Sequence, residues 1–228
     1  MTDTLLIWDP AHGKDVPGKR SPDGSHEEWR WSRERIRSIF YDLESAKKQF
    51  DVAVPYLSFD NEPGLSQRVD YYNYLAEQYK TTIMISLHND AYGTGWTSPQ
   101  GFTIFTSRGD TAADDYATTI GIELKRMLPD ERWRWDFGLS EKEITRDLDR
   151  ESNFSVLAGY RKNEIWHPTK YDGILIENLF MTNQEDLAKL KNDQWNSRLE
   201  EAYFLAIMKL MCDLGKAPTT IIGAEITP

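Results

Sequence analysis

Short apolar runs alternate with segments of helical periodicity along most of the chain. The runs are nearly continuous in apolar residues and predict strands at residues 5–9, 52–57, 82–87, 102–106 and 174–177. Apolar residues at helical spacing predict helices at residues 28–48, 65–79, 111–128 and 196–214. This alternation is typical of an α/β fold. We expect a mostly parallel central sheet of about five or six strands with helices on both faces.

Two segments between these elements have little periodicity. Residues 14–26 combine glycine, proline and charge and predict a loop, whereas residues 129–173 are rich in Trp, Arg, Asp and Glu and look like an insertion. Asn183, followed by Gln-Glu-Asp, predicts a capped helix start. We expect one domain over residues 1–216 and a C-terminal tail over residues 217–228.

Composition narrows the class of protein. A chain of 228 residues can bury a sizeable core, and its single cysteine, Cys212, rules out a framework of internal disulfides. Cys212 lies in an apolar helical run and is predicted to be a core residue. The net charge of −10 argues against attraction to nucleic acid or anionic lipid.

Targeting signals are missing from the sequence as given. No apolar stretch approaches the length of a membrane span, so we expect none. The first residues, MTDTLLIWDPAHG, lack the basic segment and long apolar stretch of a signal peptide. We therefore expect synthesis in the cytoplasm without a signal peptide.

Three ionisable side chains occur where predicted strands end. His12 follows the first strand, His88 follows the third, and Glu177 closes the strand ILIE. The carboxyl ends of parallel strands are where open α/β sheets place their sites. A half-buried carboxylate at such a position needs a partner, and a metal ion, or a catalytic role beside one, would provide it.

A third metal ligand is expected at the start of the first helix. Catalytic zinc typically takes three protein ligands from imidazole nitrogen and carboxylate oxygen. Glu27 and Glu28 both qualify, and spacing alone does not choose between them. Histidines in ordinary loops and acidic residues in the first turn of an ordinary helix would give the same sequence pattern, so a non-ligand role is the alternative for each of these residues. The other two histidines, His26 and His167, are expected at the surface or behind the ligands.

Several motifs in order carry a resemblance to a known family. They are DPAHG at residues 9–13, EEWRWSR at 27–33, LSQR at 65–68 with Asn73, SLHNDA at 86–91, Gly101-Phe102, and LIENLFMTN at 175–183. Together they resemble the zinc-dependent N-acetylmuramoyl-L-alanine amidases of the amidase-3 type, over about residues 4–212. Three positions depart from the family pattern: Ala11 and Leu179 replace glycines, and Asp90 replaces a frequent asparagine.

The resemblance implies a zinc (Zn²⁺) site made by His12, Glu28 and His88, with Glu177 as the catalytic residue. Glu28 is favoured over Glu27 because an aromatic residue and a Ser-Arg pair follow it as in the family. The implied reaction is hydrolysis of the amide bond between N-acetylmuramic acid and L-alanine in bacterial peptidoglycan. Glu177 would take a proton from water and pass it to the leaving amine.

Substrate contacts are predicted at Arg68, Arg150 and Asp90. A guanidinium matches the carboxylates of a stem peptide, although an internal ion pair is the alternative for each arginine. The insertion at residues 129–173 would help to shape the cleft, and its aromatic residues could stack on sugar rings or form a small buried core. These aromatic residues are Trp133, Trp135 and Phe137.

Two other functions remain open at this point. One is a non-catalytic peptidoglycan-binding module with an amidase-like fold, and the other is a zinc peptidase or deacetylase on the same scaffold. We expect a monomer that resembles a phage endolysin, of prophage type, and acts on the cell wall or periplasmic peptidoglycan. A housekeeping amidase without its leader would have the same appearance.

Overall fold

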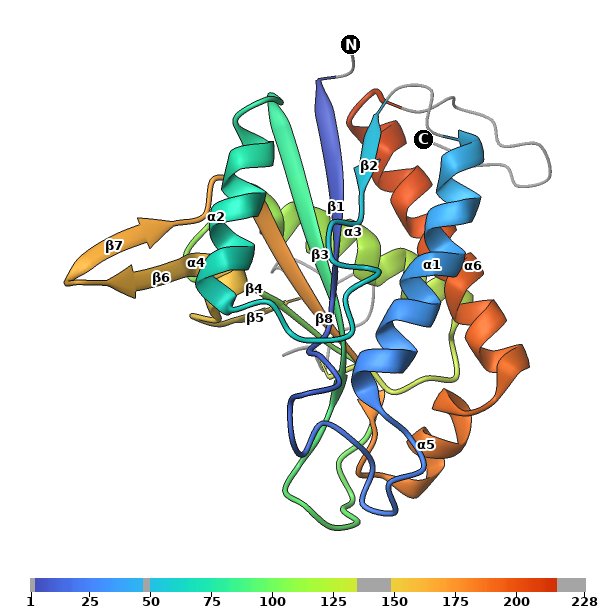
Figure 1. The fold of residues 1–228 in the computed structure, drawn as a ribbon. Coiled ribbons are helices and arrows are strands. Elements are labelled where there is room, and N and C mark those ends of the chain that lie inside the picture. The colour runs from blue at the N-terminus through green and yellow to red at the C-terminus, as the bar shows by residue number, and fades with distance from the viewer. Residues whose placement is uncertain (1–2, 47–49, 135–148, 217–228) are drawn as a thin grey trace.

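The computed structural model describes residues 3–46, 50–134 and 149–216, which are built around a six-stranded sheet (Figure 1). The strand order is β2-β1-β3-β8-β4-β5. Four adjacent strands run parallel to one another: β2 (Asp51–Ala53), β1 (Thr4–Pro10), β3 (Thr81–Asp90) and β8 (Asp172–Phe180). Strand β4 (Thr103–Thr106) is antiparallel to β8, and β5 (Arg150–Glu151) is parallel to β4. The predicted α/β class with a mostly parallel sheet is confirmed.

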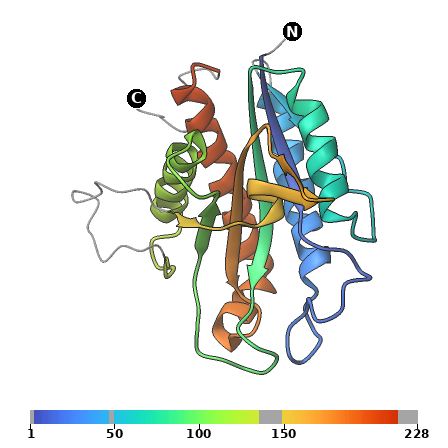
Figure 2. The ribbon, with the colours of Figure 1, turned by 90° about the vertical axis from the view of Figure 1, so that its left-hand side faces the viewer.

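Helices cover both faces of this sheet. Helices α1 (Glu28–Ala46), α3 (Ala112–Met127) and α6 (Asp193–Asp213) enclose the larger core, which includes Trp8, Ile85 and Tyr203. Helices α2 (Leu65–Ala76) and α4 (Ser155–Ala158) enclose a smaller core on the opposite face. Figure 1 shows α2 on one side of the sheet and α1 and α6 on the other, and Figure 2 looks onto the strands side by side. Both faces of the central strands are therefore covered by helices and buried, which explains their continuous apolar sequences.

Two central strands run further than their apolar patterns predicted. Strand β3 continues to Asp90 and β8 to Phe180, so His88 and Glu177 lie within strands and pair with each other in register. Strand β2 is shorter than predicted, because residues 54–59 turn away, with Leu57 N–H donating to the Val54 carbonyl. The carboxyl ends of β1, β3 and β8 gather at the lower end of the molecule in Figure 1.

The segment predicted to be an insertion has regular structure in its described part. It contains β5, α4 and a hairpin of β6 (Gly159–Lys162) and β7 (Ile165–Pro168). Asn163 and Glu164 both have positive φ, as the two-residue turn of a hairpin requires. The hairpin is held against α2, where Tyr160 donates to Asp70. The helices and strands of this segment are too short to give a clear periodic pattern of apolar residues, which explains why the sequence did not predict them.

Smaller predictions had mixed outcomes. Asn183 caps α5 (Gln184–Leu190), since its side chain accepts from the backbone N–H groups of Glu185 and Asp186, as predicted. Cys212 is half-buried on α6, so its placement in the core was wrong. No helix in the described part of the chain is both long and apolar enough to cross a membrane. The predicted tail, residues 217–228, lies outside the described residues.

Candidate metal centre

Four elements carry the side chains of the candidate centre. His12 lies two residues beyond β1, Glu28 is the first residue of α1, and His88 lies near the end of β3. Glu177 is the partner of His88 on the neighbouring strand β8. The long loop between His12 and Glu28 allows the start of α1 to return to the end of β1. Parallel strands and a returning helix thus bring together residues that are far apart in sequence.

His12, Glu28 and His88, which we call the triad, are close enough to share one ion. One ligand atom from each lies within 4.8 Å of the others. His88 Nδ1 is 2.9 Å from Glu28 Oε1, and His12 Nε2 is 3.7 Å from Glu28 Oε2. The two imidazole rings are nearly perpendicular, with centroids 5.0 Å apart. Two imidazole nitrogens and one carboxylate form the donor set of a catalytic zinc site.

Glu28 has the features of a ligand. Its side chain is only 2% exposed, and Oε1 lies 2.9 Å from His88 Nδ1 and accepts a hydrogen bond from the backbone N–H of Asn89. Its other oxygen, Oε2, is buried and has no hydrogen-bond partner among the described residues. Burial alone would raise the pKa of Glu28, yet the hydrogen bond from His88 and the charges of both histidines lower it. An ionised carboxylate with one unpaired oxygen toward two imidazoles is suited to a divalent cation.

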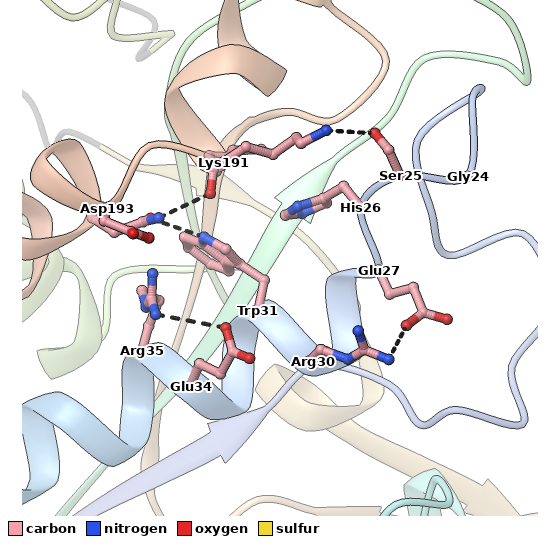
Figure 3. Close-up of a pocket in the computed structure, with 12 residues that line it drawn as sticks. Gly24, Ser25, His26, Glu27, Arg30, Trp31, Glu34, Arg35, Lys191 and Asp193 are labelled. Carbon is pink, nitrogen blue, oxygen red and sulfur yellow. Dashed lines mark hydrogen bonds and ion pairs between the residues drawn. The ribbon is translucent and has the colours of Figure 1, made fainter.

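Glu27 faces a different part of the molecule. Its carboxylate forms an ion pair of 2.8 Å with Arg30, as Figure 3 shows. Both side chains line a hollow of about 300 Å³ between the start of α1 and the α5–α6 junction, which we call the charged pocket. The structure therefore brings Glu28, and not Glu27, to the two histidines.

Glu177 is buried beside the triad without a hydrogen bond to its Oε2 from the described residues. Burial, together with the nearby charges of Glu28 and Asp90, raises the pKa of Glu177 well above its usual value. This environment favours the protonated carboxyl, whereas a cation nearby would favour the charged form. It is thus placed to exchange a proton close to the triad.

The triad opens onto a cleft of about 270 Å³. His12, His88 and Glu177 line one part of it, and Leu65, Phe154 and Val156 from α2 and the α4 region line another. Ionisable and apolar side chains therefore line the same hollow, a combination that suits binding and chemistry. The inserted segment contributes Phe154 and Val156 to the lining of the cleft.

Of the three predicted substrate contacts, Arg68 lines this cleft, whereas Asp90 and Arg150 are not among its lining residues. Arg68 is buried, and its guanidinium donates to Asp9 at 2.8 Å, so it already has an internal partner. Burial raises the pKa of Asp90, and the charge of Arg150 on β5 opposes part of this rise. Asp90 Oδ2 is 3.6 Å from Arg134. The substrate-binding roles of Arg68, Arg150 and Asp90 stay predictions.

The remaining sequence candidates lie outside the triad. His26 is buried and pairs with Asn89 at 2.8 Å, and burial lowers the pKa of His26. His167 stacks on Tyr160 in the hairpin. Trp133 stacks on Phe102 at 4.5 Å and packs against the core, which favours the buried-core alternative for this residue. Trp135 and Phe137 fall outside the described residues.

One residue of the site was missed by the sequence analysis. Glu62 Oε1 lies 3.3 Å from His12 Nδ1, on the side of the ring turned away from Glu28. Its sequence context, DNEPG, is that of a surface turn and contains no signal for a role in a site. Only the approach of this turn to the loop after β1 reveals the contact.

Fold and site together define an α/β protein with a candidate cation centre at the carboxyl edge of its parallel strands. Residues 6–209 match the model of the family described as N-acetylmuramoyl-L-alanine amidase, and the chain belongs to this family. The comparison with curated proteins finds no match.

Solved structures of several amidases have the same fold. An N-acetylmuramoyl-L-alanine amidase from Clostridium difficile 630 aligns with a TM-score of 0.69 at 20% identity, covering 93% of this chain and 97% of that one. AmiC2 of Nostoc punctiforme aligns with a TM-score of 0.69 at 18% identity, covering 92% and 98%. The catalytic domain of CwlV from Bacillus (Paenibacillus) polymyxa var. colistinus gives 0.68 at 17% identity, covering 95% and 99%. At such identities these similarities show the fold.

One departure from the family pattern has a structural consequence. Leu179, where the resemblance leads us to expect glycine, has a φ of 61° and a fully buried side chain. The β3–β8 register shifts next to this residue, between His88 and Asp90. A leucine in the left-handed region is strained, and burial of its side chain offsets that strain. Ala11, the other replaced glycine, is not among the residues with positive φ.

Proposed function

We propose that this chain is a zinc-dependent amidase that hydrolyses the bond between N-acetylmuramic acid and L-alanine in bacterial peptidoglycan. One observation carries the proposal: His12, Glu28 and His88 converge beside a cleft in a chain of this family, and Glu28 Oε2 has no hydrogen-bond partner among the described residues. Family membership supports the substrate class. The triad supports the metal.

The donor set supports zinc as the ion. Two imidazoles and one carboxylate leave an open position on a four-coordinate ion, which distinguishes a catalytic site from a closed structural one. Bound zinc would supply a Lewis acid for the scissile carbonyl and lower the pKa of a water molecule to about 7. His12, Glu28 and His88 would hold it from three separate elements.

Glu177 is proposed as the proton-transfer residue. Its carboxyl lines the cleft next to His88, and burial favours the protonated form. A cation at the triad would favour its carboxylate, which could then accept a proton from the attacking water. The same carboxyl would afterwards donate that proton to the nitrogen of the leaving L-alanine. The apolar part of the cleft would limit access of competing water.

Substrate binding is proposed at the rim of the cleft. Asp90 and Arg150 provide charges of opposite sign near β3 and β5, suited to amide and carboxylate groups of a stem peptide. Arg68, with its guanidinium on Asp9, is proposed to act by holding the end of β1 in place. The endolysin-like origin, the monomeric state and the synthesis without a signal peptide stay predictions from the sequence.

The test is metal analysis of the purified protein combined with product identification from digested sacculi. We expect one zinc ion per chain and stem peptides released with a free L-alanine amino group. Cleavage within the stem peptide would indicate a peptidase, and release of acetate a deacetylase. Wall binding without any product would indicate the non-catalytic module, and each of these three results would contradict the proposal.

A further inference from the structure

Each imidazole of the triad has a second nitrogen that faces away from Glu28. His12 Nδ1 lies 3.3 Å from Glu62 Oε1, and His88 Nε2 lies 3.1 Å from Ser86 Oγ. Both rings are therefore held from behind as well as from the side of the triad. Partners of this kind fix the tautomer and orientation of metal-binding histidines.

Counting the protons of Ser86 assigns the tautomer of His88. The Ser86 hydroxyl donates its single proton to Asp9 Oδ2 at 2.6 Å. Its oxygen can then only accept at its contact with His88, so His88 Nε2 carries the proton. His88 Nδ1 lies 2.9 Å from Glu28 Oε1, so the ring can carry a second proton there. A cation that took the place of this proton would leave the neutral ring with its free lone pair on Nδ1, the nitrogen that faces Glu28.

Glu62 assigns the tautomer of His12 in the same way. A carboxylate only accepts hydrogen bonds, so its place 3.3 Å from His12 Nδ1 favours a proton on that nitrogen over a lone pair. The guanidinium of Arg68 lies 3.4 Å from the same Glu62 oxygen and places a positive charge beside this carboxylate. The free lone pair of His12 is therefore on Nε2, which also faces Glu28.

The turn that carries Glu62 is fastened to the loop that carries His12. The backbone N–H of Glu62 donates to Asp15 Oδ1 at 2.8 Å, and that of Lys14 donates to the Asp60 carbonyl at 2.7 Å. A Cβ on Gly13 would lie 2.0 Å from the Glu62 nitrogen, so only glycine allows this approach. Glu62 is thus held in a defined place beside His12.

A single buried chain of contacts joins the two supports. Arg68 lies 3.4 Å from Glu62 and donates to Asp9 at 2.8 Å, and Asp9 in turn accepts from Ser86. Asp9, Arg68 and Ser86 are each at most 1% exposed. In a medium of low polarity such a satisfied network is rigid, so the two rings are oriented as a pair.

We propose that Glu62 is a positioning residue, which acts with Ser86 to direct His12 Nε2 and His88 Nδ1 at a common cation. This inference rests on the proposed function, because it takes the triad to be the zinc site. Glu62 would not touch the substrate. Its effect would be on how tightly the triad holds the ion.

Zinc affinity measured by competition with a chelator tests this role. Glu62→Ala should weaken zinc binding by about 10–100-fold, the usual effect of removing such a partner. Glu62→Gln, which keeps an oxygen acceptor but loses the charge, should recover part of the loss and shows that folding is intact. Glu27→Gln is the matched control, because it removes a carboxylate next to Glu28 that faces the charged pocket.

The outcomes separate the inference from the proposed function. Wild-type affinity in Glu62→Ala, with the wild-type protein binding zinc, would overturn the positioning role and leave the amidase proposal intact. A wild-type protein that binds no zinc would overturn both. Nitrogen-15 spectra of the zinc-loaded protein provide a second readout, with a proton expected on His12 Nδ1 and on His88 Nε2. The opposite tautomer in either ring would overturn the inference.

Discussion

The cleft and the charged pocket have similar volumes, about 270 and 300 Å³, and both contain a histidine and glutamates. They differ in how those groups are paired. In the charged pocket Glu27 pairs with Arg30, Lys191 donates to Ser25, and Trp31 donates to Asn196 (Figure 3). At the cleft, Glu177 in the lining and Glu28 behind the two histidines each keep one oxygen without a hydrogen bond from the described residues.

This contrast shows that the candidate metal centre differs from the charged pocket in whether its carboxylates have partners, and not in the volume of the hollow or the types of residue. Glu27 and Glu28 are adjacent in sequence, yet at the start of α1 Glu27 lines the charged pocket whereas Glu28 meets the two histidines. A carboxylate on the surface that already pairs with an arginine is stable without a bound ligand. A buried carboxylate oxygen without a partner costs free energy unless a ligand compensates.

The strongest test of this comparison is to remove each glutamate in turn. Glu28→Gln should abolish stoichiometric zinc and reduce amidase activity to background, because a neutral amide replaces the charged ligand. Glu27→Gln should retain both. Zinc content by elemental analysis and product release from sacculi measure the two effects. Equal zinc loss in both variants would contradict the difference between the two hollows.

The next effect concerns Glu177. Glu177→Gln should retain zinc and lose about 10²–10⁴-fold in turnover, the usual contribution of a positioned proton-transfer group. The amide keeps the size of the side chain but cannot carry the proton. Turnover on purified sacculi and zinc content are the measurements. Full activity in this variant would remove Glu177 from the mechanism.

A smaller effect concerns the strained backbone next to the triad. Leu179→Ala should destabilise the fold by about 2–5 kcal/mol, because a buried leucine is truncated. Leu179→Gly should be less destabilising than alanine by about 1 kcal/mol, since glycine adopts a positive φ without strain. Urea unfolding of both variants measures the difference. A glycine variant less stable than the alanine variant would show that Leu179 is not strained.

The smallest effect is expected in the charged pocket. Arg30→Ala breaks the exposed ion pair with Glu27 and should cost less than about 1 kcal/mol, with unchanged zinc content. Its side chain is 61% exposed, so water replaces the lost partner. Thermal or urea unfolding checks the stability. A large loss of zinc would show that the two hollows are coupled through α1.

Particular residues show how far the sequence analysis reached. His12, His88 and Glu177 were predicted because each follows or ends a short run of apolar residues. This pattern is local, so it is visible in the sequence. Glu62 was not found, because its turn-like context says nothing of the loop that it meets. The length of β2 and the burial of Cys212 were predicted wrongly, since a turn and a helix end override the apolar pattern.

The amino-acid pattern by itself determined the α/β class, most elements and the strand ends that carry the candidate ligands. The pattern determines these features because buried apolar side chains recur with the repeat of a helix or strand, and this repeat is visible in the sequence. The tertiary structure decided which of two adjacent glutamates meets the histidines, which nitrogen of each ring faces Glu28, and that Leu179 takes a positive φ. Those features depend on the register of paired strands and the paths of loops, so they arise only when distant segments pack together.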